Sequence, residues 1–286
     1  MADDRKSPGA PIIICAPVAR SGTTFCKYLI SSHPNTYRAD LKEDFLLHNA
    51  KNLQEYVDGL FKVWEGMDYE LTLAPGRRTP DSLLSAMGDV LLTHIGRRES
   101  PDRMVLKTPR LCDLEVALRL FPGCQILIMI RDPRSILSSY LRAQKSWGSE
   151  RSFEQVAKLW AESIRNLSSV LAENQPAVRS KQLILVRYEK LVSNTEAELR
   201  GLLEKLGLPV AQECIDAANN PVVRGSSYLP FINGERVNFQ PQPMPDGFDP
   251  LVRWKDWTPE RLARFNRICG SLMNKWGYQP IDETNR

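Results

Sequence analysis

Uninterrupted apolar runs recur at four places along the chain and predict strands that are buried on both faces. They span residues 11–15, 103–107, 124–130 and 182–187, and each is followed by polar turn residues and then by a segment of helical periodicity. Strands that alternate with helices in this way are typical of a parallel sheet that is covered on both sides. The pattern therefore predicts an α/β fold of three layers, with a mostly parallel central sheet flanked by helices.

Helical periodicity also appears between the first two predicted strands. Two stretches, at about residues 50–63 and 80–97, indicate an insertion within the domain. Two further helices are expected to start after Asp132 and Thr258, because each of these capping residues is followed by a proline. The segment 239–250 carries four prolines and is predicted to be a long surface loop without regular structure, of the kind that often forms a lid.

Length and composition limit the class of protein. The chain has 286 residues, 42% of them hydrophobic, so we expect residues 1–10 to form a flexible N-terminal tail and residues 11–286 to form a single domain. Lysine and arginine outnumber acidic residues by only 38 to 34, which argues against a nucleic-acid partner. Six scattered cysteines without a C-x-x-C pair indicate reduced core residues. No apolar run approaches the roughly 20 residues of a membrane span, so a cytoplasmic location is expected.

The first candidate site is the junction "RSGTT", residues 20–24, between the first predicted strand and a helix. A helix N-terminus offers unpaired N–H groups and a positive dipole end, both of which favour an anion. Gly22 allows close backbone approach, Ser21, Thr23 and Thr24 supply hydroxyls, and Arg20 supplies a charge. The junction predicts a phosphate or sulfate site, with an ordinary capped helix as the alternative.

An ATP loop is a weaker interpretation of the same junction. A Walker A loop has the pattern G-x-x-x-x-G-K-[ST], whereas the residue after Gly22 is threonine and no glycine lies in the six positions before it. No predicted strand ends in an acidic pair that would hold magnesium.

A second candidate site follows the strand at 124–130. Arg131 lies at the carboxyl end of that strand, the edge where α/β sheets bind ligands, and Ser139 lies eight residues later in the adjoining helix. An arginine fork and a nearby hydroxyl suit a phosphate. The alternatives are an ion pair of Arg131 with Asp132 or Glu189, and a packing role for Ser139.

Together, "RSGTTF" after the first strand and "RDPRSILSSY" after a later one resemble the sulfotransferase superfamily that uses 3′-phosphoadenosine 5′-phosphosulfate (PAPS). Residues 186–209 resemble the family's "YEDL" segment and the helix after it, and residues 252–278 resemble its C-terminal end. The resemblance covers most of the chain and is weak at about 45–100 and 210–250, where such enzymes usually build acceptor sites. It implies the P-loop-NTPase-like sulfotransferase fold.

The resemblance also implies which residues hold the cofactor. The first motif would bind the 5′-phosphosulfate, and Arg131 with Ser139 would bind the 3′-phosphate. The rings of Phe25 and Tyr188 would contact adenine, although both are also ordinary core positions. Arg253 and Lys255 would close over the phosphates, although the family's "RKG" loop is not recognisable there. The cofactor-binding set is thus Arg20, Ser21, Gly22, Thr23, Thr24, Phe25, Arg131, Ser139, Tyr188, Arg253 and Lys255.

Sulfuryl transfer depends mainly on positioning and on charge stabilisation, by analogy with phosphoryl transfer. Arg20 would stabilise charge on the leaving 5′-phosphate, and Lys107 would stabilise the sulfuryl group, unless it is only a solvated strand-end lysine. Because the sulfuryl oxygens carry less charge than a terminal phosphoryl group, cationic side chains can suffice, and no metal is predicted.

A general base must take the proton of the acceptor. Cytosolic members use the histidine of a "KTH" stretch, but Pro109 stands at that position here. The stretch "ADLKEDFLLH" instead resembles the "KEPHFF" segment of carbohydrate sulfotransferases, in which the glutamate is the base. Glu43 matches that glutamate and is expected to stay ionised near the cationic phosphate site. Asp44 and His48 remain alternatives, as does a solvated acidic turn.

These observations predict an enzyme that transfers a sulfuryl group from PAPS, releasing 3′-phosphoadenosine 5′-phosphate (PAP), with a carboxylate base. The acceptor would be a hydroxyl, or alternatively an amine, of a small molecule, a carbohydrate or a natural product; sugars, lipid-like alcohols and phenols all stay open. The alternatives are a P-loop-like nucleotide kinase and a non-catalytic nucleotide-binding protein. The sequence does not predict an oligomeric state.

Overall fold

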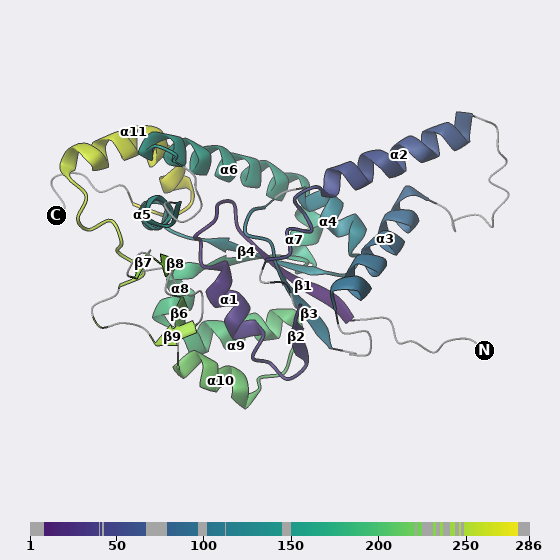
Figure 1. Ribbon diagram of the computed structural model, residues 1–286, viewed down its shortest axis with the longest axis horizontal. Helices are drawn as coiled ribbons and strands as arrows, with labels where there is room; N and C mark the ends of the chain where they lie inside the picture. Colours follow the sequence, from purple (N-terminus) through teal and green to yellow (C-terminus); the bar gives the residue numbers. More distant parts are fainter. Residues whose placement is uncertain are drawn as a thin grey trace.

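The computed structural model describes residues 9–39, 41, 43–66, 79–96, 102–111, 113–144, 150–220, 222–224, 231–232, 235–236, 241–243, 246 and 249–279. At its centre is a five-stranded parallel sheet in the order β2-β3-β1-β4-β5 (Figure 1). The strands are β1 (Gly9–Cys15), β2 (Thr36–Arg38), β3 (Arg103–Lys107), β4 (Gln125–Ile130) and β5 (Leu183–Arg187). The four predicted strands are all present, and the short edge strand β2 was not predicted.

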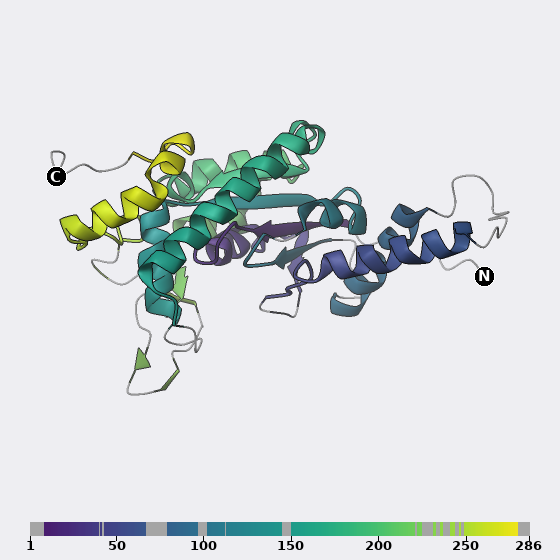
Figure 2. The same ribbon diagram turned by 90° about the horizontal axis from the view of Figure 1, so that it is seen from above.

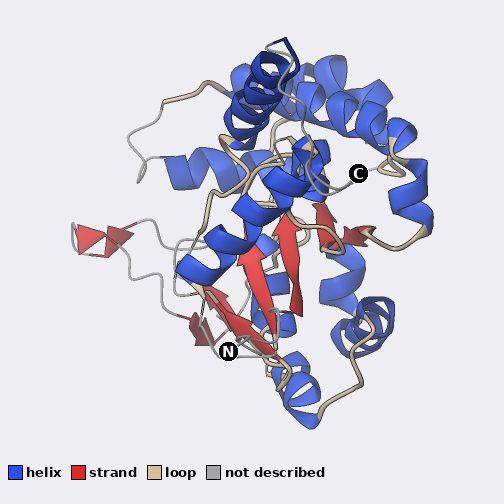
Figure 3. Cartoon of the chain, turned by 90° about the vertical axis from the view of Figure 1, so that its right-hand side faces the viewer, coloured by secondary structure: helices blue, strands red, loops and turns tan. Residues whose placement is uncertain are grey.

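Helices cover both faces of this sheet (Figure 3). On one face, the larger core takes buried residues from seven helices of the described chain: α2 (Ala50–Gly66), α3 (Pro80–Ile95), α4 (Leu114–Leu120), α5 (Pro133–Ala143), α6 (Phe153–Glu173), α7 (Gln175–Arg179) and α11 (Pro259–Lys275). The other face packs against α1 (Thr23–Ile30), α8 (Tyr188–Ser193), α9 (Thr195–Leu206) and α10 (Gln212–Asn219). The predicted three-layer α/β fold is therefore confirmed.

The central strands are apolar throughout because alternate side chains enter different cores. In β1, Ile13 and Cys15 face the larger core, whereas Ile12 and Ile14 face the smaller one. Figure 2 shows α6 crossing the sheet beside α11, while α2 extends beyond the sheet at the opposite end. Five cysteines lie in the described part of the chain, and all are buried free thiols, as expected. None of the helices in that part has the length and apolar character that a bilayer span requires.

The predicted helix starts at Asp132 and Thr258 are confirmed, since both side chains cap the helix that follows. The expectation of a wholly irregular segment at 239–250 is wrong at three residues. β9 (Pro241–Pro243) pairs antiparallel with β6 (Val222–Arg224), and a second short ribbon joins β7 (Phe231–Ile232) to β8 (Glu235–Arg236). A two-stranded ribbon tolerates prolines because its strands can leave alternate N–H positions unpaired.

The parallel topology brings four strand ends to one edge of the sheet. Ile14 of β1 is in register with Lys107 of β3, and Ile130 of β4 is in register with Arg187 of β5. Loops that follow these strands therefore meet at the same edge, where α/β proteins usually bind ligands.

A glycine in α3 makes the insertion sensitive to substitution. A Cβ atom at Gly88 would lie 1.9 Å from the carbonyl oxygen of Leu120, at the end of α4. We predict that Gly88→Ala lowers the free energy of unfolding by about 1–3 kcal/mol, because the clash with backbone outweighs the gain of about 1 kcal/mol in helix propensity. Urea unfolding would measure this difference.

Gly201 in α9 is the matched control. It also lies inside a helix, but nothing is within 4 Å of the Cβ that alanine would add. Gly201→Ala should therefore raise the free energy of unfolding by up to about 1 kcal/mol. Equal stabilisation by both substitutions would show that α3 does not pack closely on α4.

Candidate functional site

The loop between β1 and α1 is shaped for close approach of a ligand. Gly22 is the N-cap of α1, with φ 96°, and no side chain caps the helix. Its φ angle favours glycine, and a Cβ there would also lie 2.2 Å from the ring of Tyr188. Arg20 has a left-handed φ of 76°, which is unusual for a residue with a side chain and is found at ligand-binding loops. The hydroxyl of Ser21 donates to the carbonyl of Val18 at 2.7 Å, so that hydroxyl supports the loop itself.

The two sequence motifs contact each other directly. Arg20 donates from Nε to the hydroxyl of Ser139 at 3.0 Å, and Arg131 donates from Nη1 to the carbonyl of Arg20 at 2.7 Å. Burial and the nearby charge of Arg131 lower the pKa of Arg20 to about 10, which still leaves its guanidinium charged at neutral pH. The structure thus brings together residues that are more than a hundred positions apart.

Arg131 is almost fully enclosed within the site. It is 6% exposed, it donates from Nη2 to the carbonyl of Pro250 at 2.5 Å, and its guanidinium lies 4.3 Å from the ring centre of Tyr188. Its Nε is buried with no hydrogen-bond partner. The acidic residues considered as alternatives have other partners: Asp132 pairs with Arg134, and Glu189 accepts from the backbone N–H of Asp132 at 2.7 Å. Arg131 therefore binds carbonyls of two loops.

The two rings proposed for adenine lie side by side. Phe25, in the first turn of α1, meets Tyr188 edge to face with ring centres 6.5 Å apart. Tyr188 is buried between Gly22 and Arg131, whereas Phe25 is half-buried. The ring of Phe25 thus remains partly accessible beside the loop.

Lys107 connects the phosphate loop with the acidic segment. Its Nζ donates to the hydroxyl of Thr24 at 3.1 Å and to Oε1 of Glu43 at 2.6 Å. The lysine side chain is 4% exposed and that of Glu43 is 39% exposed. Lys107 is therefore a buried cation of the site, which contradicts the alternative of a solvated strand-end lysine.

Asp44 and Glu43 have different hydrogen-bond partners. Its Oδ2 accepts the backbone N–H of Lys107 at 2.5 Å, and its Oδ1 accepts the hydroxyl of Thr108 at 2.7 Å and the N–H of Leu46 at 3.2 Å. The carboxylate of Asp44 thus fixes the segment to the end of β3, while the carboxylate of its neighbour reaches the buried lysine.

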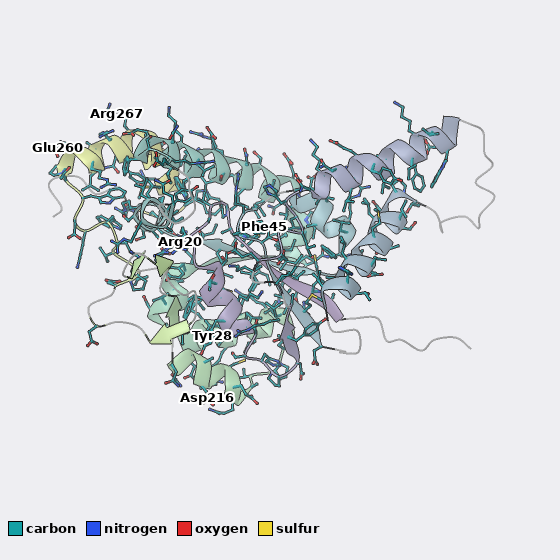
Figure 4. The ribbon with its side chains drawn as sticks, viewed as in Figure 1. Arg20, Tyr28, Phe45, Asp216, Glu260 and Arg267 are labelled. Atoms are coloured by element: carbon teal, nitrogen blue, oxygen red, sulfur yellow. The ribbon has the colours of Figure 1, made fainter. Side chains whose placement is uncertain are left out.

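The histidines do not lie between the cofactor loop and Lys107. His48 is exposed and meets Phe45 edge to face at 6.3 Å. His33 is buried, with Nε2 2.8 Å from the carbonyl of Pro209, as expected for a structural residue. Phe45 itself was missed by sequence reasoning: it has a positive φ of 50° and a side chain that is 49% exposed. Figure 4 shows it near the strand ends, on the same side of the molecule as Arg20.

Arg253 and Lys255 differ in their surroundings. Arg253 is half-buried, and burial together with the charges of Arg142, Arg131 and Arg20 lowers its pKa to about 10. Lys255 is exposed, and its backbone N–H donates to the carbonyl of Val252 at 3.4 Å. Only Arg253 of the two joins the other arginines.

Four arginines therefore share one region beside a buried lysine. Burial and, after it, the repulsion between these charges lower the pKa values of Arg20 and Arg253, and a bound polyanion would relieve the repulsion. In the described part of the chain, no group of three or more histidine, cysteine, aspartate or glutamate side chains is arranged to hold a metal ion. The arrangement suits a ligand with two separated anionic groups.

Solved structures with the same fold carry sulfotransferase domains. The sulfotransferase domain of the Synechococcus PCC 7002 olefin synthase aligns with a TM-score of 0.54 and 16% identity, over 95% of this chain and 97% of that one. The sulfotransferase domain from the curacin biosynthetic pathway aligns with a TM-score of 0.53 and 17% identity, over 96% of this chain and all of that one. At these identities the likeness concerns the fold.

Curated sequences extend the comparison. Protein-tyrosine sulfotransferase A of Caenorhabditis elegans is 24% identical over 97% of this chain and 70% of its own length. The protein-tyrosine sulfotransferase of Drosophila melanogaster is 23% identical over 94% of this chain and 52% of its own length. The model of the sulfotransferase family matches residues 11–212, from β1 to the start of α10. The resemblance to the PAPS-dependent sulfotransferase superfamily is thus confirmed, and the chain belongs to the sulfotransferase family.

Proposed function

We propose that this protein transfers the sulfuryl group of PAPS to a hydroxyl group, with Glu43 as the general base. The observation that carries the proposal is the double contact of Lys107, whose ammonium lies 3.1 Å from Thr24 Oγ1 and 2.6 Å from Glu43 Oε1. Thr24 belongs to the loop that would hold the donor, and Glu43 is the group that would deprotonate the acceptor. The buried cation Lys107 therefore contacts both the donor loop and the proposed base.

PAPS would replace hydrogen bonds that the residues of the site now make with one another. The loop from Arg20 to Thr24 would bind the 5′-phosphosulfate with its hydroxyls and uncapped helix N-terminus. Arg131, Ser139 and Arg253 would bind the 3′-phosphate. In the structure Ser139 accepts from Arg20, and Arg131 donates to two carbonyls, so phosphate oxygens would compete for these groups.

Adenine would lie against the half-buried ring of Phe25, and the buried ring of Tyr188 would support the ring of Phe25 edge to face. An aromatic face binds a purine by stacking regardless of its hydrogen-bonding pattern. The phosphates would then supply the specificity for PAPS.

The chemical step requires one bond to form and one to break at sulfur. The acceptor oxygen attacks the sulfur in line, the bond from sulfur to the 5′-phosphate oxygen breaks, and PAP leaves with the added negative charge. The acceptor proton moves to the carboxylate of Glu43. Lys107 stabilises the transferring oxygens and Arg20 the leaving phosphate, as expected for catalysis by positioned charges.

The acceptor side opens at Glu43, because this carboxylate is 39% exposed while Lys107 behind it is buried. One observation supports a hydroxyl acceptor over an amine, and another supports an acceptor with apolar surface. Both curated relatives are named for protein tyrosine, whose phenol is a hydroxyl. The exposed ring of Phe45 lies two residues from the base and offers an apolar surface to a bound acceptor. Phenols are therefore the first acceptors to test, ahead of sugars and other alcohols.

The cofactor assignment predicts metal-independent binding of PAP. In calorimetric titrations with EDTA present, we expect PAP to bind at least about tenfold more tightly than ATP, because ATP lacks the 3′-phosphate that Arg131 and Ser139 would contact. Titration of ATP with magnesium is the comparison. Tight binding of ATP that requires magnesium, with no binding of PAP, would favour the nucleotide kinase alternative.

The base assignment predicts different effects at two adjacent carboxylates. Glu43→Gln should keep the fold and the PAP affinity and lower kcat about 100- to 10,000-fold, because the amide cannot accept a proton. Its melting temperature should fall, because the substitution removes the charge partner of the buried Lys107. The assay would follow transfer of labelled sulfate from PAPS to 4-nitrophenol or to a tyrosine peptide.

Asp44→Asn is the control for this substitution. It weakens two hydrogen bonds that hold the segment to the end of β3 and one within the segment, so it should lower the free energy of unfolding by about 1–3 kcal/mol. Normal turnover in Glu43→Gln would remove Glu43 as the base and leave Asp44 and His48 to be tested.

A further inference from the structure

The pairing of β4 with β5 continues for two residues beyond the sheet. The two strands are parallel and in register up to the last residue of each. At the next position, the guanidinium of Arg131 lies 4.3 Å from the ring centre of Tyr188. One residue further on, the backbone N–H of Asp132 donates to Oε1 of Glu189 at 2.7 Å. The carboxylate of Glu189 thus takes the place of a strand carbonyl, and the stacked pair lies between this hydrogen bond and the end of the sheet.

The segment after α11 holds the second oxygen of the Glu189 carboxylate. The hydroxyl of Tyr278 donates to Oε2 at 3.0 Å, and the tyrosine is buried. Burial and, after it, the charge of Glu189 raise the pKa of Tyr278, so its hydroxyl keeps its proton at neutral pH. Arg187 holds the same segment, because its guanidinium lies 4.8 Å from the ring centre of Tyr278 and donates to the carbonyl of Trp276. Both carboxylate oxygens of Glu189 therefore have fixed partners.

Glu189 is committed to these two hydrogen bonds. It forms no ion pair in the part of the chain that the structure describes, whereas the carboxylate of Asp132 pairs with Arg134 at 2.7 Å. A half-buried carboxylate is costly unless its oxygens accept hydrogen bonds, so Glu189 stays directed at the N–H of Asp132 and at Tyr278. Because the first of these bonds holds backbone, it also fixes the residue just before it, which is Arg131.

Arg131 depends on a fixed backbone, because its guanidinium contacts three separate segments. It donates to the carbonyls of Arg20 and Pro250 at 2.7 and 2.5 Å, and it stacks on Tyr188. Its Nε is buried and has no hydrogen-bond partner among the described residues. A buried N–H without an acceptor is costly, and a phosphate oxygen would supply the acceptor. The direction of this N–H depends on the backbone from which the side chain starts.

We propose that Glu189 is a positioning residue that holds Arg131 in place for the 3′-phosphate of the cofactor, through its hydrogen bond to the backbone of Asp132. This inference rests on the proposed function, which assigns that phosphate to Arg131. Glu189 acts through the backbone and touches neither the cofactor nor the reacting atoms. Fixing the arginine before binding reduces the ordering cost when the phosphate arrives.

A double-mutant cycle on the full chain, with PAP as the ligand in calorimetry, tests this coupling. Glu189→Ala should weaken PAP binding about tenfold, because it releases the backbone that follows Arg131. In an Arg131→Ala background the same substitution should cause no further loss, since the side chain that Glu189 positions is gone. Glu189→Gln should keep the affinity within about twofold, because its amide can accept from Asp132 and donate to the oxygen of Tyr278.

Glu198→Ala is the matched control. This glutamate is exposed on α9, and the variant should bind PAP as the unaltered protein does. If Glu189→Ala does not fold, Tyr278→Phe removes one of the two contacts of the carboxylate while keeping the ring. Tyr278→Phe should weaken PAP binding about threefold, and again only when Arg131 is present.

Two results would overturn the inference: PAP affinity that Glu189→Ala leaves unchanged, or an equal loss with and without Arg131. Hydrogen exchange of the unliganded proteins, followed by NMR, gives a second measurement that needs no cofactor. The amide of Asp132 should exchange faster in Glu189→Ala than in the unaltered protein or in Glu189→Gln, and equal rates in all three would also overturn the inference. Lack of PAP binding by the unaltered protein would overturn the proposed function, and the exchange of this amide would still decide whether Glu189 holds the backbone.

Discussion

The site depends on the contacts of the buried ammonium of Lys107. This ammonium lies at the end of β3, is almost completely enclosed, and has the hydroxyl of Thr24 on one side and the carboxylate of Glu43 on the other. A buried lysine is costly unless its charge is paired, so the acidic segment must stay against the end of the strand. Hydrogen bonds from the end of β3 to the carboxylate of Asp44 hold the segment in place, so the carboxylate of Glu43 is not used for this purpose. The two neighbouring acids thus have different contacts: Asp44 binds the end of the strand, and Glu43 pairs with the lysine ammonium.

The arginines present the opposite situation, because their charges are brought together and only partly balanced. Two carbonyl dipoles and an aromatic face, instead of a carboxylate, stabilise Arg131, and its Nε stays without a hydrogen-bond partner among the described residues. A carboxylate at this position would neutralise the cluster and compete with an anionic ligand. Dipoles stabilise the cation while leaving its net charge in place, so the region keeps a strong attraction for phosphate. Burial and, after it, this concentration of positive charge lower the pKa values of Arg20 and Arg253.

The sequence was sufficient for those features that arise from local pattern. The apolar runs predicted the central strands because both faces of the sheet are covered. The two motifs indicated Arg20 and Arg131, which follow strands, and Ser139, which lies in the helix after Arg131. The edge strand β2 was missed because three residues carry no periodicity. The pairing of β9 was missed for another reason, since its partner lies about twenty residues away and its prolines argue against a strand.

The choice between Glu43 and Asp44 shows why the contacts of individual site residues required a structure. The two residues are adjacent and both are acidic, and in the sequence only the resemblance to the "KEPHFF" segment favoured Glu43 over Asp44. That resemblance did not show how the contacts of the two carboxylates differ. The distinction arises from the direction of each side chain relative to β3, a strand more than sixty residues away. The same applies to Arg253 and Lys255, which a short turn directs to opposite environments. Residue type and spacing can nominate a cation or a base, but the strand or helix that it packs against decides whether its charge reaches the ligand.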